Sequence, residues 1–145
     1  MYKEGSVPMK TKLTYFGHAC FMLTHGDVSM IFDPFLTGNT WDKAKKEDIK
    51  CQYIFVSHGH DDHYGDTDFI AKANDALVIS TAEVAGKAAA AGCRTHAMHL
   101  GGKFDFEFGS VRIVPAFHGA GVPGGHAAGC IVDFYGDIVY FAGDT

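Results

Sequence analysis

The segment "SHGHDDH", residues 57–63, concentrates side chains that bind transition metals. It places His58, His60, Asp62 and His63 in the spacing His-x-His-x-Asp-His. Imidazole and carboxylate groups suit zinc, and they also bind iron and manganese. A solvated histidine-rich loop is the alternative interpretation. A cluster this dense, placed directly after an apolar run, favours a metal site.

The order of these side chains indicates two ions rather than one. In an extended segment alternate side chains point the same way, so His58 and His60 can bind one ion. Asp62 and His63 lie further along the turn and can face a second ion. Two such ions, about 3.5–4 Å apart, can hold a hydroxide between them, and zinc lowers the pKa of bound water to about 7. Such a pair of ions would make a nucleophile available at neutral pH, so no serine or cysteine nucleophile is required.

A buried strand is expected to carry this segment, because the apolar run "CQYIFVS" at 51–57 leads into the cluster. The next elements should alternate between helix and strand, and Gly92 should lie just past the end of the second helix. The predicted elements in this part are strands at 12–26 (two, with a kink at Gly17), 28–36 and 76–81, and helices at 66–75 and 82–92.

Only strands are predicted from residue 103 onward. The run "KFDFEFG" alternates, so that Phe104, Phe106 and Phe108 share one face. These strands are expected at 103–109, 110–118, 129–136 and 137–143. The sequence thus predicts a mixed α/β fold with helices on at least one face of a sheet.

The composition indicates one domain and argues against two classes of partner. The chain has 145 residues, 47% of them hydrophobic, and a net charge of −5. Its one basic run, "DKAKKED" at 42–48, mixes lysines with acids, so we expect no nucleic-acid partner. No apolar stretch reaches membrane-spanning length, and "MYKEGSVPMK" lacks the apolar core of a signal peptide, so we expect no membrane partner.

The cysteines predict a reducing compartment. Cys20, Cys51, Cys93 and Cys130 are far apart, form no Cys-x-x-Cys pair and lie among apolar or small residues. Buried, reduced thiols and a cytoplasmic location are therefore expected.

Several motifs together resemble the metallo-β-lactamase superfamily. They are "MKTKLTYFGHACFMLTHG", "IFDPFLTGN", "YIFVSHGHDDHYGDT", "VPAFHGAG" and "YFAGDT". In detail they are most similar to the UPF0173 metal-dependent hydrolases, which are related to L-ascorbate-6-phosphate lactonases. The resemblance runs from about Met9 to the last residue. It implies an α/β fold, the αββα sandwich of that superfamily.

The resemblance implies a set of metal ligands. His58, His60 and His118 would bind the first of two divalent ions, and Asp62 and His63 would bind the second. These ions would be zinc in the first instance, with manganese or iron as alternatives.

A bridging ligand and an unfinished site also follow from the resemblance. Asp144 would bridge the two ions, whereas the last ligand of the superfamily, a histidine, would lie beyond residue 145. We therefore expect residues 9–145 to form only the N-terminal half of the sandwich plus the first strands of the second half. The rest of the fold, a second chain or a homo-oligomer should complete it. Residues 1–8 are expected to be an extension, either natural or a remnant of cloning.

Four residues carry further, weaker hypotheses. Asp33 should hydrogen-bond a ring N–H of a ligand histidine from outside the metal's coordination sphere, or else form a turn before Pro34. His18 is a candidate catalytic residue that meets the substrate, or else a core or turn histidine. Asp62 could hydrogen-bond the attacking hydroxide as well as bind metal. His126 could reach the mouth of the site, although its glycine-rich loop at 119–129 reads more readily as a mobile rim.

The leading functional hypothesis is a metal-dependent hydrolase acting on a small ester, lactone or phosphoester. A metal-dependent nuclease or phosphodiesterase is one alternative, and the net negative charge of the chain counts against it. The other alternative is a non-catalytic metal-binding fragment that needs a partner half.

Overall fold

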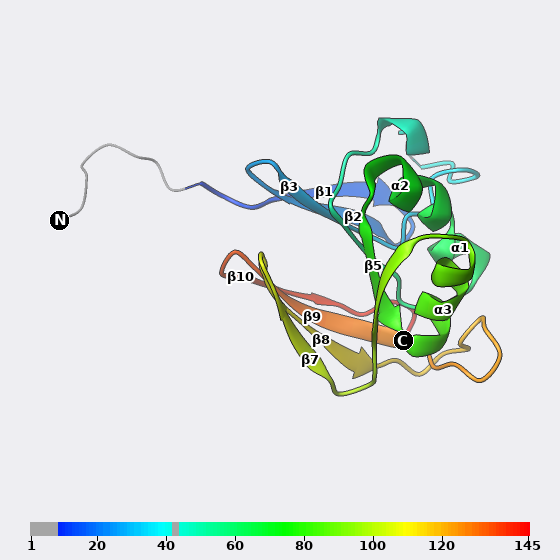
Figure 1. The fold of residues 1–145 in the computed structure, drawn as a ribbon. Coiled ribbons are helices and arrows are strands. Elements are labelled where there is room, and N and C mark those ends of the chain that lie inside the picture. The colour runs from blue at the N-terminus through cyan, green and yellow to red at the C-terminus, as the bar shows by residue number, and fades with distance from the viewer. Residues whose placement is uncertain (1–8, 42–43) are drawn as a thin grey trace.

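Two β-sheets packed face to face form the framework, with helices on the outside of one of them (Figure 1). The computed structural model describes residues 9–41 and 44–145. The predicted extension at 1–8 and two residues of the basic run, 42–43, lie outside these described residues.

The first sheet has six strands in sequential order, β1-β2-β3-β4-β5-β6. β1, β2 and β3 form an antiparallel meander, whereas β3 to β6 run parallel. Because parallel neighbours end at the same edge, the loops after these strands gather there. The strands are β1 (Lys12–Gly17), β2 (Cys20–His25), β3 (Val28–Phe32), β4 (Tyr53–Phe55), β5 (Leu77–Thr81) and β6 (Arg94–Met98).

Helices connect the parallel strands and cover the outer face of this sheet. The 3-10 turn η1 (Lys46–Asp48) precedes β4, and the one-turn helix α1 (Asp61–Tyr64) follows it. The helices α2 (Thr67–Asn74) and α3 (Ala82–Ala90) link β4 to β5 and β5 to β6. Figure 1 shows all three α-helices on one side of the molecule.

The second sheet is an antiparallel meander in the order β10-β9-β8-β7. Among the described residues no helix lies on its outer face, where Ile131, Ile138 and Tyr140 are exposed. The observed layers are therefore helix, sheet, sheet. The strands are β7 (Lys103–Phe106), β8 (Gly109–Pro115), β9 (Ala128–Phe134) and β10 (Asp137–Phe141).

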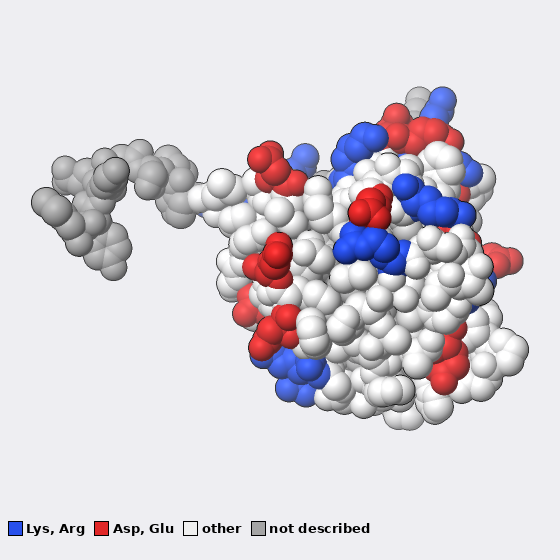
Figure 2. Space-filling view, viewed as in Figure 1, with Lys and Arg blue, Asp and Glu red and all other residues white. Residues whose placement is uncertain are grey.

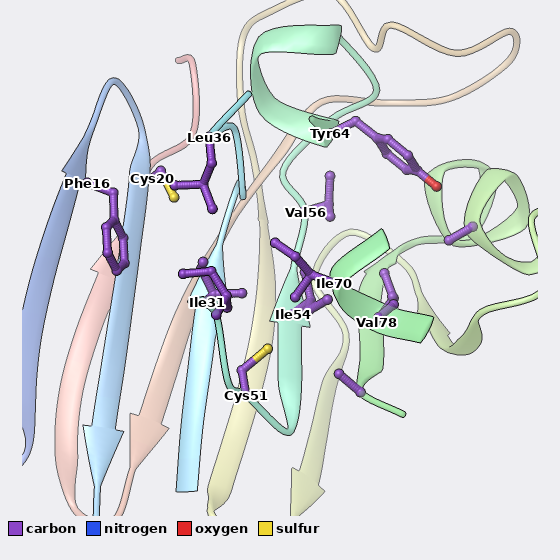
Figure 3. Packing of buried hydrophobic residues seen from close by; sticks show 14 of the residues in the cluster. Phe16, Cys20, Ile31, Leu36, Cys51, Ile54, Val56, Tyr64, Ile70 and Val78 are labelled. Carbon is purple, nitrogen blue, oxygen red and sulfur yellow. The ribbon is translucent and has the colours of Figure 1, made fainter. Parts of the chain in front are cut away.

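Two hydrophobic cores lie on opposite faces of the first sheet. In β4, Ile54 faces the helices and Phe55 faces the second sheet, and both are fully buried. Figure 3 shows Ile31, Ile54 and Val78 of three neighbouring strands beside Ile70 of α2. Burial on both faces explains why these strands are continuous apolar runs in the sequence.

Most predicted elements are present, with two differences. β6 was not predicted, and neither was α1, which occupies the turn expected after the extended pair His58 and His60. Asp66 precedes α2, but its carboxylate does not cap that helix and accepts hydrogen bonds from Leu36 and Thr37 instead. Gly92 follows α3 with φ +90°, as expected of a residue at the helix end.

The cysteine and membrane predictions can be compared with the structure directly. Cys51, Cys93 and Cys130 are free; Cys20, Cys51 and Cys130 are buried, and Cys93 is partly buried. Within residues 9–41 and 44–145, no helix has both the length and the apolar character needed to span a bilayer.

Candidate metal centre

The histidine cluster lies at the edge where the parallel strands end. It follows β4 directly, and α1 then turns the chain away. The amides of His63 and Tyr64 both donate to the carbonyl of His60. This single turn moves Asp62 and His63 away from the extended pair His58 and His60. The expected division into two pairs is thus produced by a helix start rather than by an extended loop.

A first set of donors comprises His58, His60 and His118. One ring nitrogen from each lies within 4.8 Å of the other two. His118 comes from the loop after β8, in the opposite sheet. The centroids of the three rings are 4.7–5.2 Å apart and the ring planes are nearly perpendicular, so the rings surround a common point rather than stack.

A second set of donors comprises His18, Asp62 and His63, again within 4.8 Å of one another. His18 Nε2 lies 3.1 Å from Asp62 Oδ2 and 3.3 Å from His63 Nε2. His18 is in the turn between β1 and β2, whereas Asp62 and His63 are in α1 after β4, so two separate parts of the first sheet's edge converge here.

Asp144 lies between the two sets. Its Oδ2 is 3.0 Å from His63 Nε2 and 3.7 Å from His118 Nε2. The preceding residue, Gly143, has φ +63°, and an added Cβ would lie 2.8 Å from the Cβ of Ser57. Glycine therefore lets the chain pass closely over Ser57 and deliver the carboxylate to this position.

Asp33 and Ser57 form a fully buried support beneath the cluster. Asp33 accepts hydrogen bonds from the Ser57 amide at 2.7 Å, the Ser57 hydroxyl at 2.6 Å and His63 Nδ1 at 2.6 Å. Asp33 has φ +43°. The hypothesis that Asp33 holds a ring N–H therefore agrees with this geometry, and the ring is that of His63.

The hydrogen bonds of Ser57 fix the tautomer of His58. Since the Ser57 hydroxyl hydrogen points to Asp33, its oxygen is left to accept from His58 Nδ1 at 2.8 Å. The lone pair of neutral His58 is then on Nε2. Among the described residues, no group is hydrogen-bonded to this buried nitrogen. A buried, unpaired imidazole lone pair facing two further histidines fits a divalent metal ion.

Electrostatics distinguish the two buried histidines. Burial, with help from the neighbouring rings of His63 and His60, lowers the pKa of His58 to about 4. Burial also acts to lower the pKa of His63, but the hydrogen bond and charge of Asp33 and the charge of Asp144 outweigh it, so that pKa is raised. His58 is therefore neutral at pH 7, whereas His63 is surrounded by negative charge.

The glycine-rich loop contacts the cluster through its backbone. The Gly59 amide donates to the Ala120 carbonyl at 2.7 Å. A Cβ on Gly121, where φ is +67°, would lie 2.3 Å from the amide nitrogen of His60. The loop was predicted to be a mobile rim of the site. In the structure its backbone packs against the turn between His58 and His60 and supports that turn.

The remaining histidines lie elsewhere. His126 lines a recess together with Glu83 and His99 and joins neither donor set. His25 stacks on Tyr135, away from the cluster. Ser57 is the functional candidate that sequence reasoning missed. A serine before a histidine carries no signal by itself, because its role depends on Asp33, 24 residues earlier.

Comparisons with known proteins agree with this geometry. The family model for the beta-lactamase superfamily domain matches residues 12–144. A UPF0173 metal-dependent hydrolase of Natranaerobius thermophilus is 52% identical over 134 residues, and one of Symbiobacterium thermophilum is 46% identical over 134 residues. In both cases the match covers 92% of this chain and 60% of the relative. The chain thus spans about 60% of the length of these curated relatives.

A solved structure shares the same arrangement of strands and helices. Igni18, described as a novel metallo hydrolase from the hyperthermophilic archaeon Ignicoccus hospitalis, superposes with a TM-score of 0.84 at 28% identity. The superposition covers 93% of this chain and 61% of Igni18.

Proposed function

The chain belongs to the beta-lactamase superfamily, and we propose that it carries the metal centre of a metal-dependent hydrolase acting on a small ester, lactone or phosphoester. The orphaned, fully buried Nε2 of His58 carries this proposal, because a polar atom is rarely left unpaired inside a protein without a ligand. The names of the relatives, metal-dependent hydrolases, support it.

The donor sets support two divalent ions, with zinc as the first candidate and manganese or iron as alternatives. His58, His60 and His118 would hold one ion. Asp62 and His63 would hold the other, and Asp144 would lie between them. Two such ions would supply a hydroxide nucleophile at neutral pH and polarise the oxygen of the group under attack.

The chain's own residues would orient this chemistry. Ser57 and Asp33 keep the Nε2 lone pairs of His58 and His63 directed at the centre, because they bind both Nδ1 atoms. The Asp62 carboxylate is half exposed, so it can accept a hydrogen bond from the nucleophile while remaining near His63. His63 lowers the pKa of Asp62 against the opposing effect of burial, which keeps Asp62 ionised at neutral pH.

Substrate class is a further proposal. Among small esters and lactones, we favour a lactone of a phosphorylated sugar acid, because the sequence motifs resemble those of relatives of the L-ascorbate-6-phosphate lactonases. A nuclease is the second enzymatic candidate. Figure 2 shows lysine and arginine side chains interspersed with aspartate and glutamate on the viewed face, rather than gathered in a stripe that would follow a phosphate backbone.

The test is hydrolysis of a substrate panel by the chain supplied with Zn²⁺ or Mn²⁺. The panel should include sugar-acid lactones, simple esters and phosphodiesters. His58→Ala and Asp144→Ala should each abolish turnover, whereas His99→Ala, an exposed histidine outside both donor sets, should keep it. Turnover close to wild type in either of the first two variants would overturn the proposal.

Metal analysis separates the alternatives. Two ions per chain are expected of the enzyme, whereas one ion or none, without turnover of any compound, would favour the non-catalytic metal-binding fragment. Cleavage of phosphodiesters alone would favour the nuclease or phosphodiesterase.

We also propose that further protein covers the outer face of the second sheet. Ile138 is 66% exposed and Tyr140 60% exposed, both on the edge strand β10. The relatives are longer than this chain, so additional polypeptide is the first candidate for the cover and a second copy is the next. Sedimentation should show self-association of the chain alone that the pair Ile138→Lys and Tyr140→Lys removes. A monomer at all concentrations tested would count against the second copy.

A cytoplasmic location is proposed on the basis of the cysteines. The thiols of Cys51, Cys93 and Cys130 are free, and burial raises the pKa of Cys51 to about 12, which keeps it unreactive. Such thiols are typical of a reducing compartment.

A further inference from the structure

The backbone at His18 holds its ring over the second donor set. His18 has φ +54°, a left-handed conformation that a non-glycine residue adopts only when its surroundings impose it. The His18 carbonyl accepts a hydrogen bond from the Tyr15 hydroxyl at 3.0 Å. The edge of the His18 ring contacts Phe35, with centroids 5.7 Å apart. These contacts fix the direction of the ring toward Asp62 and His63.

The distances around His63 Nε2 match the edges of a tetrahedral zinc site. Two ligands at about 2.0–2.1 Å from a tetrahedral ion lie about 3.3 Å from each other. His18 Nε2 lies 3.3 Å from His63 Nε2 and 3.1 Å from Asp62 Oδ2. His63 Nε2 in turn lies 3.0 Å from Asp144 Oδ2 and 3.7 Å from Asp62 Oδ2. His18, Asp62 and His63 therefore offer three donor atoms at separations that one ion requires, and Asp144 Oδ2 lies beside one of them, His63 Nε2.

The positions of the protons favour a cation at this point. His63 Nδ1 donates to Asp33, so the Nε2 of neutral His63 presents a lone pair. That lone pair faces the Nε2 of His18 and the oxygens of Asp62 and Asp144. Lone pairs and carboxylates in such proximity repel one another unless a positive charge, a metal ion or a proton, lies among them.

We propose that His18 is a ligand of the second metal ion, together with Asp62, His63 and Asp144. This inference rests on the proposed function and goes beyond it. The family resemblance takes the last ligand of that ion from a histidine beyond residue 145, and it offers His18 only as a substrate contact. With His18, the described chain supplies two imidazoles and two carboxylates from its own residues. That donor set suits zinc and other borderline divalent cations.

The alternative role for His18 is to donate its Nε2–H to Asp62 and only position that ligand. Both roles fit a 3.1 Å contact, but they differ in whether His18 bonds to the metal. A measurement that detects the metal–nitrogen bond itself is therefore required.

The experiment uses the full chain loaded with two equivalents of ¹¹³Cd²⁺ and a proton–cadmium correlation spectrum. Ring protons of each coordinated histidine should correlate with one of two cadmium resonances, and signals absent from His18→Asn identify His18. We expect His18 and His63 to share one resonance, and His58, His60 and His118 to share the other. Correlations from His63 without any from His18 would overturn the inference and leave the proposed function intact. No correlation from any of the five would overturn both.

Titration with Zn²⁺ supplies a second readout. His18→Asn should weaken the second binding step by at least about 100-fold, more than the loss of a residue that only orients a ligand. His99→Asn, an exposed histidine, is the matched control and should leave both steps unchanged. A change below tenfold in His18→Asn, with circular dichroism equal to that of wild type, would contradict a ligand role.

Discussion

Asp33 Oδ2 and His63 Nδ1 lie 2.6 Å apart, with both side chains fully buried. Through Ser57 the same carboxylate also reaches His58. One buried acid thus sets the tautomers of two histidines that belong to different donor sets. Burial raises the pKa of Asp33, while the hydrogen bonds from His63 and Ser57 act in the opposite direction.

Replacing Asp33 by asparagine should weaken both metal sites. Asparagine keeps the shape but offers a single oxygen, so it cannot accept from the Ser57 amide, the Ser57 hydroxyl and His63 as Asp33 does. We expect affinity for the first and second Zn²⁺ to fall by about 10–100-fold each, measured by isothermal titration calorimetry. Asp27→Asn, at an exposed turn, should change neither. An unchanged affinity in Asp33→Asn would show that the rings are held without this carboxylate.

Removing the hydroxyl of Ser57 should affect the first site more than the second. Ser57→Ala leaves His58 Nδ1 without its partner, whereas the bond between Asp33 and His63 remains. The first binding step should weaken by about tenfold. Ser80 is a matched control, because it is equally buried and its hydroxyl donates to the Val56 carbonyl. Equal effects of Ser57→Ala and Ser80→Ala would refute the relay through Ser57.

The metal-free protein should lose stability on acidification through His58. The pKa of His58 falls from 6.5 to about 4 on folding, so below pH 6.5 the unfolded chain binds a proton that the folded chain does not. This contribution is complete above pH 6.5 and is lost as the pH falls toward 4. Between pH 7 and pH 5 it amounts to about 2 kcal/mol. The raised pKa of His63 acts above this window, where its stabilisation is lost as the pH rises.

Urea denaturation in the presence of a chelator at pH 7 and pH 5 measures this loss. His58→Asn should show a smaller decrease in the free energy of unfolding than wild type. If the two proteins lose the same amount, His58 is not the group responsible.

The glycine-rich loop should tolerate alanine at one glycine and not at another. Gly121 and Gly124 both have positive φ, +67° and +73°, so alanine carries a similar backbone cost at each. At Gly121 the new Cβ would meet the backbone of His60 at 2.3 Å, whereas nothing lies within 4 Å at Gly124. Gly121→Ala should therefore destabilise the fold by at least about 1 kcal/mol more than Gly124→Ala, measured by thermal unfolding. Equal melting temperatures of the two variants would show that the backbone of His60 can move away from the added Cβ at little cost.

The sequence predicted the strand that carries the cluster because that strand is apolar on both faces and ends at a dense run of ligand types. It did not predict β6, whose "RTHAM" is half exposed at a sheet edge and lacks that apolar signal. Neither did it predict α1, since four residues are too few for helical periodicity. Short or edge elements form because of tertiary contacts, which a local pattern does not contain.

In the candidate site, too, some residues could be identified from the sequence and others could not. His58, His60, Asp62 and His63 are neighbours in sequence, so spacing alone singled them out. The approach of His18 to Asp62 joins residues 44 positions apart and depends on the left-handed turn between β1 and β2. Apart from the preceding glycine, no residue type near His18 predicts that turn. Long-range proximity of this kind becomes visible only with the fold.

The donors come from both sheets, which has a mechanical consequence. His58, His60 and His63 follow β4 in the first sheet, whereas His118 and Asp144 follow β8 and β10 in the second. Ions bound among them would cross-link the two layers at one end, as a disulfide joins distant segments. Separating the layers would then require breaking coordination bonds, so heat resistance should climb with the concentration of free metal.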